Sequence, residues 1–94
     1  MYKIVNGKGT GKTKALLVKA HDDGAIVFCK DAESMIERAR GYGLLNMDIR
    51  NYPTLLELNE LWNSDSKVYI HNIDDFLKFY FGNLVKGYTM TYEP

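Results

Sequence analysis

The chain has 94 residues, of which 46% are hydrophobic and 13% are aromatic, and this composition excludes an intrinsically disordered chain. Twelve Lys and Arg residues balance twelve Asp and Glu residues, so no overall electrostatic field attracts nucleic acid or an anionic membrane surface. We therefore expect one compact domain that spans residues 1–94.

Cysteine usage and hydropathy bear on the location of the protein. Cys29 is the single cysteine, which excludes an internal disulfide, and it lies in the apolar run 25–29, which predicts a buried thiol. The amino terminus lacks the hydrophobic stretch of a signal peptide, and no apolar run is long enough to span a membrane. We expect a cytoplasmic protein without a membrane partner.

Three elements are predicted in the first third of the chain. Residues 2–5 are apolar and β-favouring and lead directly into glycines, as in a strand that feeds a loop. A helix is expected from Gly11, with apolar residues on one face and Asp-Asp-Gly at 22–24 as its stop. The continuous apolar run 25–29 is typical of a strand covered on both faces of a parallel sheet.

The middle of the chain continues the alternation of helices and strands. Asp31 is placed to cap a helix that runs through Arg40. Residues 47–52 predict a third strand, which Pro53 ends. Thr54 and Glu57 form a capping-box pattern ahead of a short leucine-rich helix.

The last third is predicted to contain two strands and a helix. Residues 67–73 have strand character, and Asp74 and Asp75 open a helix with apolar residues as far as Val85. Glycine inside a helix costs about 1 kcal/mol relative to alanine, so a break is expected at Gly82. Residues 88–92 predict a fifth strand. The alternation predicts right-handed crossovers and a three-layer α/β fold with a mostly parallel sheet of about five strands.

A glycine-rich segment, Asn-Gly-Lys-Gly-Thr-Gly-Lys-Thr at 6–13, lies between the first predicted strand and helix. It matches the Walker A pattern GxxxxGK[ST] except at Asn6, which tolerates a left-handed backbone as glycine does. In such loops backbone amides surround phosphate oxygens, the lysine neutralises charge and the hydroxyl holds Mg²⁺. The residues predicted to bind the phosphates of ATP are Asn6, Gly7, Lys8, Gly9, Thr10, Gly11, Lys12 and Thr13. We also assign Lys12 a catalytic role and Thr13 a role as magnesium ligand.

The glycine-rich segment has two other interpretations. It could be an ordinary turn before a helix. A dinucleotide-binding turn is disfavoured further, because Lys12 stands where the last glycine of GxGxxG is needed and no acidic residue ends the second predicted strand. Lysines concentrate around the segment, which suits a polyphosphate, although Lys14 and Lys19 fit equally well as solvent-exposed helix residues.

A second part of the site is predicted near 68–75, where an apolar strand precedes two acids. Asp74 would hold hydrated Mg²⁺ and Asp75 would orient the attacking water. Alternatively, Asp74 caps the helix that starts with Phe76, and the two roles can coexist. We interpret His71 as a hydrogen-bonded or exposed imidazole rather than a ligand.

No arginine is assigned to stabilise a transition state. Arg38 and Arg40 lie on the second predicted helix, where arginines are usually solvated, and Arg50 lies on the third predicted strand. If hydrolysis is fast, we expect a partner protein to supply this charge. An oligomer is compatible with the same requirement.

Residues 6–13 resemble the Walker A segment of phage large terminase ATPases, and the order of elements is similar to that of short P-loop proteins of phages and prophages. This resemblance implies a P-loop NTPase-like fold, location in the host cytoplasm, and a role in phage DNA metabolism or packaging. It also implies DNA, or a phage or host protein, as partner. Thr89 and Thr91 are similar to the threonine-bearing strand of helicases, although alternating threonines mark any β-strand. The chain is shorter than a terminase or helicase motor domain, so a complete motor is not expected.

Two functions follow from these patterns. The first is an ATP-binding protein that requires Mg²⁺ and acts as a slow ATPase. The second is a non-catalytic, P-loop-derived module that binds a protein or nucleic-acid partner, with the glycine-rich segment as a structural anion site. Aromatic residues within 76–81 could form its partner surface, but we expect most of them in the core.

Overall fold

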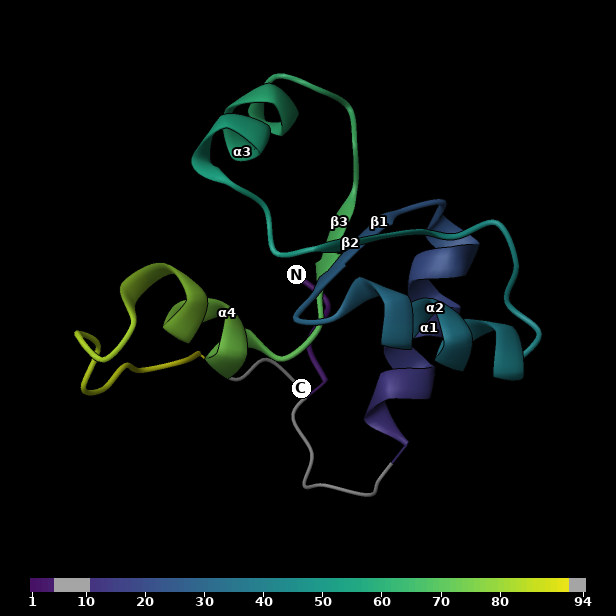
Figure 1. The fold of residues 1–94 in the computed structure, drawn as a ribbon, viewed down its shortest axis with the longest axis horizontal. Coiled ribbons are helices and arrows are strands. Elements are labelled where there is room, and N and C mark those ends of the chain that lie inside the picture. The colour runs from purple at the N-terminus through teal and green to yellow at the C-terminus, as the bar shows by residue number, and fades with distance from the viewer. Residues whose placement is uncertain (5–10, 92–94) are drawn as a thin grey trace.

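The computed structural model describes residues 1–4 and 11–91 (Figure 1). Its strands are β1 (Ile26–Cys29), β2 (Asp48–Asn51) and β3 (Val68–Ile70). They form a parallel sheet in the order β2-β1-β3. The helices are α1 (Lys12–Asp23), α2 (Ala32–Gly41), α3 (Leu55–Trp62) and α4 (Ile73–Phe81). Strands and helices therefore alternate along the part of the chain that the structure describes.

The predicted P-loop NTPase-like fold with about five strands is wrong, because the sheet of the described residues has three strands. Residues 2–4 form no strand, although the Tyr2 ring lies beside β3 with its centroid 6.3 Å from that of Tyr69. Residues 88–91 also form no strand, and all of them are exposed. A terminal strand needs a buried face to offset the entropy of ordering its backbone, and residues 88–91 have none. Residues 5 and 92 lie outside the described ranges.

The three remaining strands confirm the predictions for the middle of the sheet. All four residues of β1 are buried, as expected for a central parallel strand covered on both faces. β1 pairs with both neighbours, so that Val27 aligns with Ile49 and with Tyr69. β3 is shorter than the predicted 67–73, because the backbone turns at Asn72, with φ of 59°, into α4.

The two faces of the sheet pack against different helices (Figure 1). On one face Val27 and Cys29 pack with Leu17 of α1 and Met35 of α2. The other face packs Ile26, Phe28 and Tyr52 with the partly buried side chains Leu61, Ile70 and Phe76. Cys29 is fully buried as predicted, and burial raises the pKa of its thiol. The first face forms the larger core, and it holds α1 against the sheet.

Side-chain caps set the start of three helices. Asp31 accepts a hydrogen bond from the Ser34 amide at 3.2 Å, and Thr54 accepts one from the Glu57 amide at 3.2 Å, which confirms both predicted caps. The predicted cap at Asp74 is wrong, because Asn72 caps α4 and the helix begins at Ile73. α4 ends at Phe81 with Gly82 as its C-cap, so the expected break at this glycine is confirmed.

The length and hydropathy of a helix decide whether it can cross a membrane. Within residues 1–4 and 11–91, no helix combines the length and the apolar character needed to cross a bilayer. α1 is the longest of the described helices at 12 residues, whereas a membrane-spanning helix needs about 20.

Candidate functional site

The candidate site lies where the strands end at their carboxyl side. In an open parallel sheet the loops that follow the strands meet along one edge, and ligands bind there. β3 leads into His71 and α4, and β2 leads into Tyr52. The N-terminus of α1 reaches the same edge, because Thr13 in its first turn contacts His71. The end of the glycine-rich segment thus lies at this edge of the sheet.

Thr13 and His71 form the central contact of the site. The Thr13 Oγ1 atom lies 3.1 Å from His71 Nε2, although the two residues are 58 positions apart in the sequence. Thr13 is only 9% exposed, and His71 is half-buried. The hydroxyl is therefore held between α1 and the end of β3, away from bulk solvent.

Hydrogen bonds of the backbone hold His71 in place. Its amide donates to the carbonyl of Phe28 at 2.9 Å, which extends the pairing of β3 with β1 by one residue. Its carbonyl accepts a hydrogen bond of 2.8 Å from the Tyr52 hydroxyl, which also donates to the Asn72 carbonyl at 3.1 Å. Burial is the main reason that the pKa of Tyr52 is raised to about 12, so this phenol remains a donor at neutral pH. The imidazole thus projects from a backbone that is fixed on both sides.

Three charged side chains act on the His71 imidazole from three different helices. Burial lowers the pKa of His71, and the positive charges of Arg38 and Lys12 lower it further. The carboxylate of Asp75 acts in the opposite direction. Because the net shift is downward from 6.5, the imidazole is mainly neutral at pH 7. The charges of Lys12 of α1, Arg38 of α2 and Asp75 of α4 therefore all influence the protonation of one ring.

The structure describes only the end of the predicted phosphate loop. Asn6, Gly7, Lys8, Gly9 and Thr10 lie outside the described residues. Gly11 precedes α1 in a left-handed conformation, with φ of 74°, which favours glycine. Lys12 is the first residue of α1 and is half-buried. The first turn of α1 contains lysines and no acidic residue, so nothing in that turn offsets the positive end of the helix dipole.

The two predicted acids have different surroundings. Asp75 is half-buried, its amide donates to Asn72 Oδ1 at 3.4 Å, and its charge acts on His71. Asp74 is exposed, and its carboxylate accepts a hydrogen bond from the Tyr88 hydroxyl. Thr13 thus contacts His71 and the charge of Asp75 acts on the same ring, whereas Asp74 lies against the C-terminal segment.

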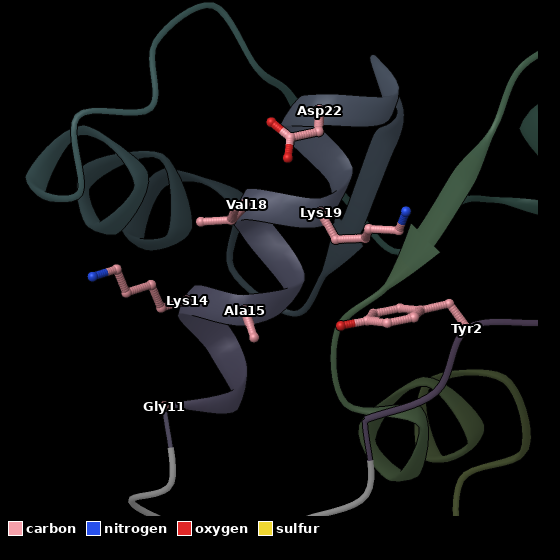
Figure 2. A pocket seen from close by; sticks show the side chains of 7 residues that line it. All are labelled: Tyr2, Gly11, Lys14, Ala15, Val18, Lys19 and Asp22. Carbon is pink, nitrogen blue, oxygen red and sulfur yellow. The ribbon is translucent and has the colours of Figure 1, made fainter. Parts of the chain in front are cut away.

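A hollow of about 450 Å³ runs beside α1, starting at its N-terminal end (Figure 2). The ring of Tyr2 forms one side, with the Lys19 ammonium 5.8 Å from the ring centroid. The lining residues are Tyr2, Gly11, Lys14, Ala15, Val18, Lys19 and Asp22. Because Gly11 belongs both to this lining and to the Walker A segment, the hollow adjoins the predicted phosphate site.

The donor set limits how a metal ion could be held. Among the residues with described positions, no cluster of three or more His, Cys, Asp or Glu side chains could hold a metal ion by itself. Thr13 and His71 offer one hydroxyl oxygen and one ring nitrogen. A cation here would need further oxygen ligands from a bound phosphate or from water.

Comparison of the chain with protein-family models, with curated proteins and with solved structures finds no match. The interpretation of the site therefore rests on its own residues and geometry. Sequence reasoning missed His71 as the partner of Thr13, and it left Arg38 outside the site. One signal could have found His71, namely its position directly after a strand at the ligand-binding edge of a parallel sheet.

Proposed function

We propose that this protein binds a nucleoside triphosphate, with ATP as the expected nucleotide, together with a divalent cation at the N-terminus of α1. The backbone amides from Gly11 onward and the Lys12 ammonium bind the phosphates, and the Thr13 hydroxyl binds the cation. The contact of the buried Thr13 hydroxyl with His71 carries the proposal. It supports the proposal because it holds the Gly-Lys-Thr end of the Walker A segment where ligands of parallel sheets bind.

The charges in the first turns of α1 and α4 also favour the N-terminus of α1 as the binding site of the phosphates. The first turn of α1 is basic and begins at a glycine, whereas the first turn of α4 is acidic and capped by Asn72. A polyphosphate is attracted to the first and repelled by the second. Mg²⁺ is the cation expected from the motif, and the proposed role of Asp74 is to contact it through water.

Slow hydrolysis of ATP is the second part of the proposal. Asp75 is the carboxylate that would orient the attacking water, because its charge already acts inside the site. Arg38 of α2 contributes a positive charge, which also acts on the His71 imidazole. An arginine aligned with the transferred phosphoryl group would accelerate hydrolysis further. That a partner protein supplies this arginine stays a prediction.

Calorimetric titration of the protein with Mg²⁺ and ATP tests the binding proposal directly. We expect saturable binding by the wild type and a loss of about tenfold or more in affinity for Lys12→Ala, because a lysine that binds phosphate is removed. Lys67→Ala is the matched control, since Lys67 is an exposed lysine directly before β3. The proposal is wrong if the wild type shows no binding at millimolar nucleotide, or if both variants bind as the wild type does.

Exposed apolar side chains favour a second candidate, a module that binds a protein or DNA partner. Leu55, Leu56 and Trp62 of α3 are 74%, 70% and 85% exposed, and Phe79 and Phe81 of α4 are about half exposed. The expectation that most aromatics of this segment lie in the core is therefore wrong. DNA binding that persists without nucleotide and weakens steeply with salt would favour this candidate, together with the role in phage DNA metabolism or packaging implied by the resemblance.

A further inference from the structure

We propose that Thr13 and His71 are neighbouring ligands of one divalent cation, and that the imidazole makes the site prefer a transition-metal complex of the nucleotide over its Mg²⁺ complex. The inference rests on the proposed function, because phosphate oxygens must complete the coordination of the ion. It replaces the expectation that His71 is only a hydrogen-bonded or exposed side chain.

The separation of the two donor atoms fits a shared ion. Metal ions of this class lie about 2.0 to 2.2 Å from their nitrogen and oxygen ligands, and ligands at right angles in an octahedral site are then about 3.0 Å apart. The observed distance from Thr13 Oγ1 to His71 Nε2 is 3.1 Å. The distance between these two atoms therefore suits adjacent ligands of one cation, which would replace the hydrogen bond.

Both ligands are held in position before any ion binds. Thr13 lies in the first turn of α1, and its side chain is buried between that helix and β3. His71 is fixed through its amide, which donates to Phe28, and through its carbonyl, which accepts from Tyr52. Ordering side chains on binding is costly, so a pair that is already ordered favours binding.

The preference for a transition metal follows from the donor set. Mg²⁺ takes oxygen ligands and keeps several waters, whereas an imidazole nitrogen suits metals later in the first row. The described part of the chain offers no group of three or more His, Cys, Asp or Glu side chains for a metal ion, so we expect phosphate oxygens of the nucleotide to complete the coordination. We therefore expect the site to take up metal and nucleotide together rather than the metal alone.

The competing explanation is that the contact of Thr13 with His71 only fastens α1 to β3. The variant His71→Gln separates these explanations, because a glutamine amide can still hydrogen-bond to the Thr13 hydroxyl but lacks the imidazole nitrogen. His21→Gln is the matched control, since His21 is the other histidine of the chain and is exposed near the end of α1.

Two measurements test the inference, with the non-hydrolysable nucleotide β,γ-methylene-ATP as probe, because its bridging group contains no nitrogen. In calorimetry we expect the Co²⁺ complex to bind the wild type about tenfold more tightly than the Mg²⁺ complex, and this ratio to vanish in His71→Gln but not in His21→Gln. In electron spin echo spectroscopy of the Mn²⁺ complex we expect modulation from an imidazole nitrogen in the wild type. The spectrum needs no variant, so it decides the question even if His71→Gln does not fold.

The outcomes separate this inference from the proposed function. If none of the metal complexes binds the wild type, the proposed function itself is wrong. If the Mg²⁺ complex binds as tightly as the others and the Mn²⁺ complex shows no nitrogen modulation, nucleotide binding stands and the imidazole is not a ligand. A preference for Co²⁺ that persists unchanged in a folded His71→Gln variant would also overturn the inference.

Discussion

The N-termini of α1 and α4 reach the same edge of the sheet, but they are stabilised in different ways (Figure 1). α4 is complete by itself, because Asn72 accepts a hydrogen bond from an amide of the first turn and two acidic residues offset the helix dipole. α1 begins at a glycine, which has no side chain for capping, and its first turn carries lysines. We therefore expect an external anion to stabilise α1 more than α4.

The same contrast extends to the polar side chains of the two helix starts. Thr13 is buried and directed at His71, whereas Asp74 is exposed and bonded to the Tyr88 hydroxyl. Asp75, one position further on, is half-buried, and its charge acts on His71. The first turn of α4 thus contributes one side chain to the site and one to the C-terminal segment.

The largest effect on stability and on nucleotide affinity is expected from removal of the Thr13 hydroxyl. In Thr13→Val the half-buried Nε2 atom of His71 loses its partner, so the free energy of unfolding should fall by about 1 to 3 kcal/mol. Nucleotide affinity should fall by about tenfold or more, because a proposed cation ligand is lost. Urea denaturation and calorimetry measure the two effects.

Thr54→Val is the control for this change, because it removes a threonine hydroxyl from the start of α3 instead. It should cost about 1 kcal/mol in stability and leave nucleotide affinity unchanged. If Thr13→Val binds nucleotide as tightly as the wild type does, the proposed role of the α1 N-terminus in nucleotide binding is wrong.

Removal of the α4 cap should affect stability alone. Asn72→Ala loses the hydrogen bond to the Asp75 amide and puts alanine at a φ of 59°, so it should cost about 1 to 2 kcal/mol. Asn72→Gly should cost less, because glycine adopts this conformation readily. Thermal denaturation of both variants shows which of them is more stable. An equal loss of stability in the two variants would show that the left-handed backbone at Asn72 does not contribute to the cost of the alanine substitution.

A smaller effect is expected from pH. The folded state lowers the pKa of His71, mainly through burial, so the folded state favours the neutral ring. This contribution to stability is fully present above the unfolded value of about 6.5 and is lost as the pH falls through the folded value. The free energy of unfolding of the wild type should therefore decrease below pH 6.5 more steeply than that of His71→Gln. Parallel curves for the two proteins would show that His71 does not contribute.

The starts of α2 and α3 were predictable from the sequence because their capping signals are local, whereas the predicted cap of α4 at Asp74 was wrong. Asp31 and Thr54 cap amides three residues away, and an apolar run with turns at both ends marks β1 as buried. The predicted strands at 2–5 and 88–92 show the limit of such signals. Alternating or apolar residues favour an extended backbone, but a strand also needs a neighbour with which to pair, and residues 2–4 and 88–91 form no strand.

The sequence by itself determined that a glycine-rich segment ends in Gly-Lys-Thr at the start of a helix, because this depends only on residues that are adjacent in the chain. Only the tertiary structure decided which side chain faces the threonine hydroxyl. His71 meets Thr13 across 58 positions because β3 pairs with β1 and α1 packs on the face of the sheet that carries Val27 and Cys29. Strand order and packing set such distances, and no pattern within a few residues encodes them.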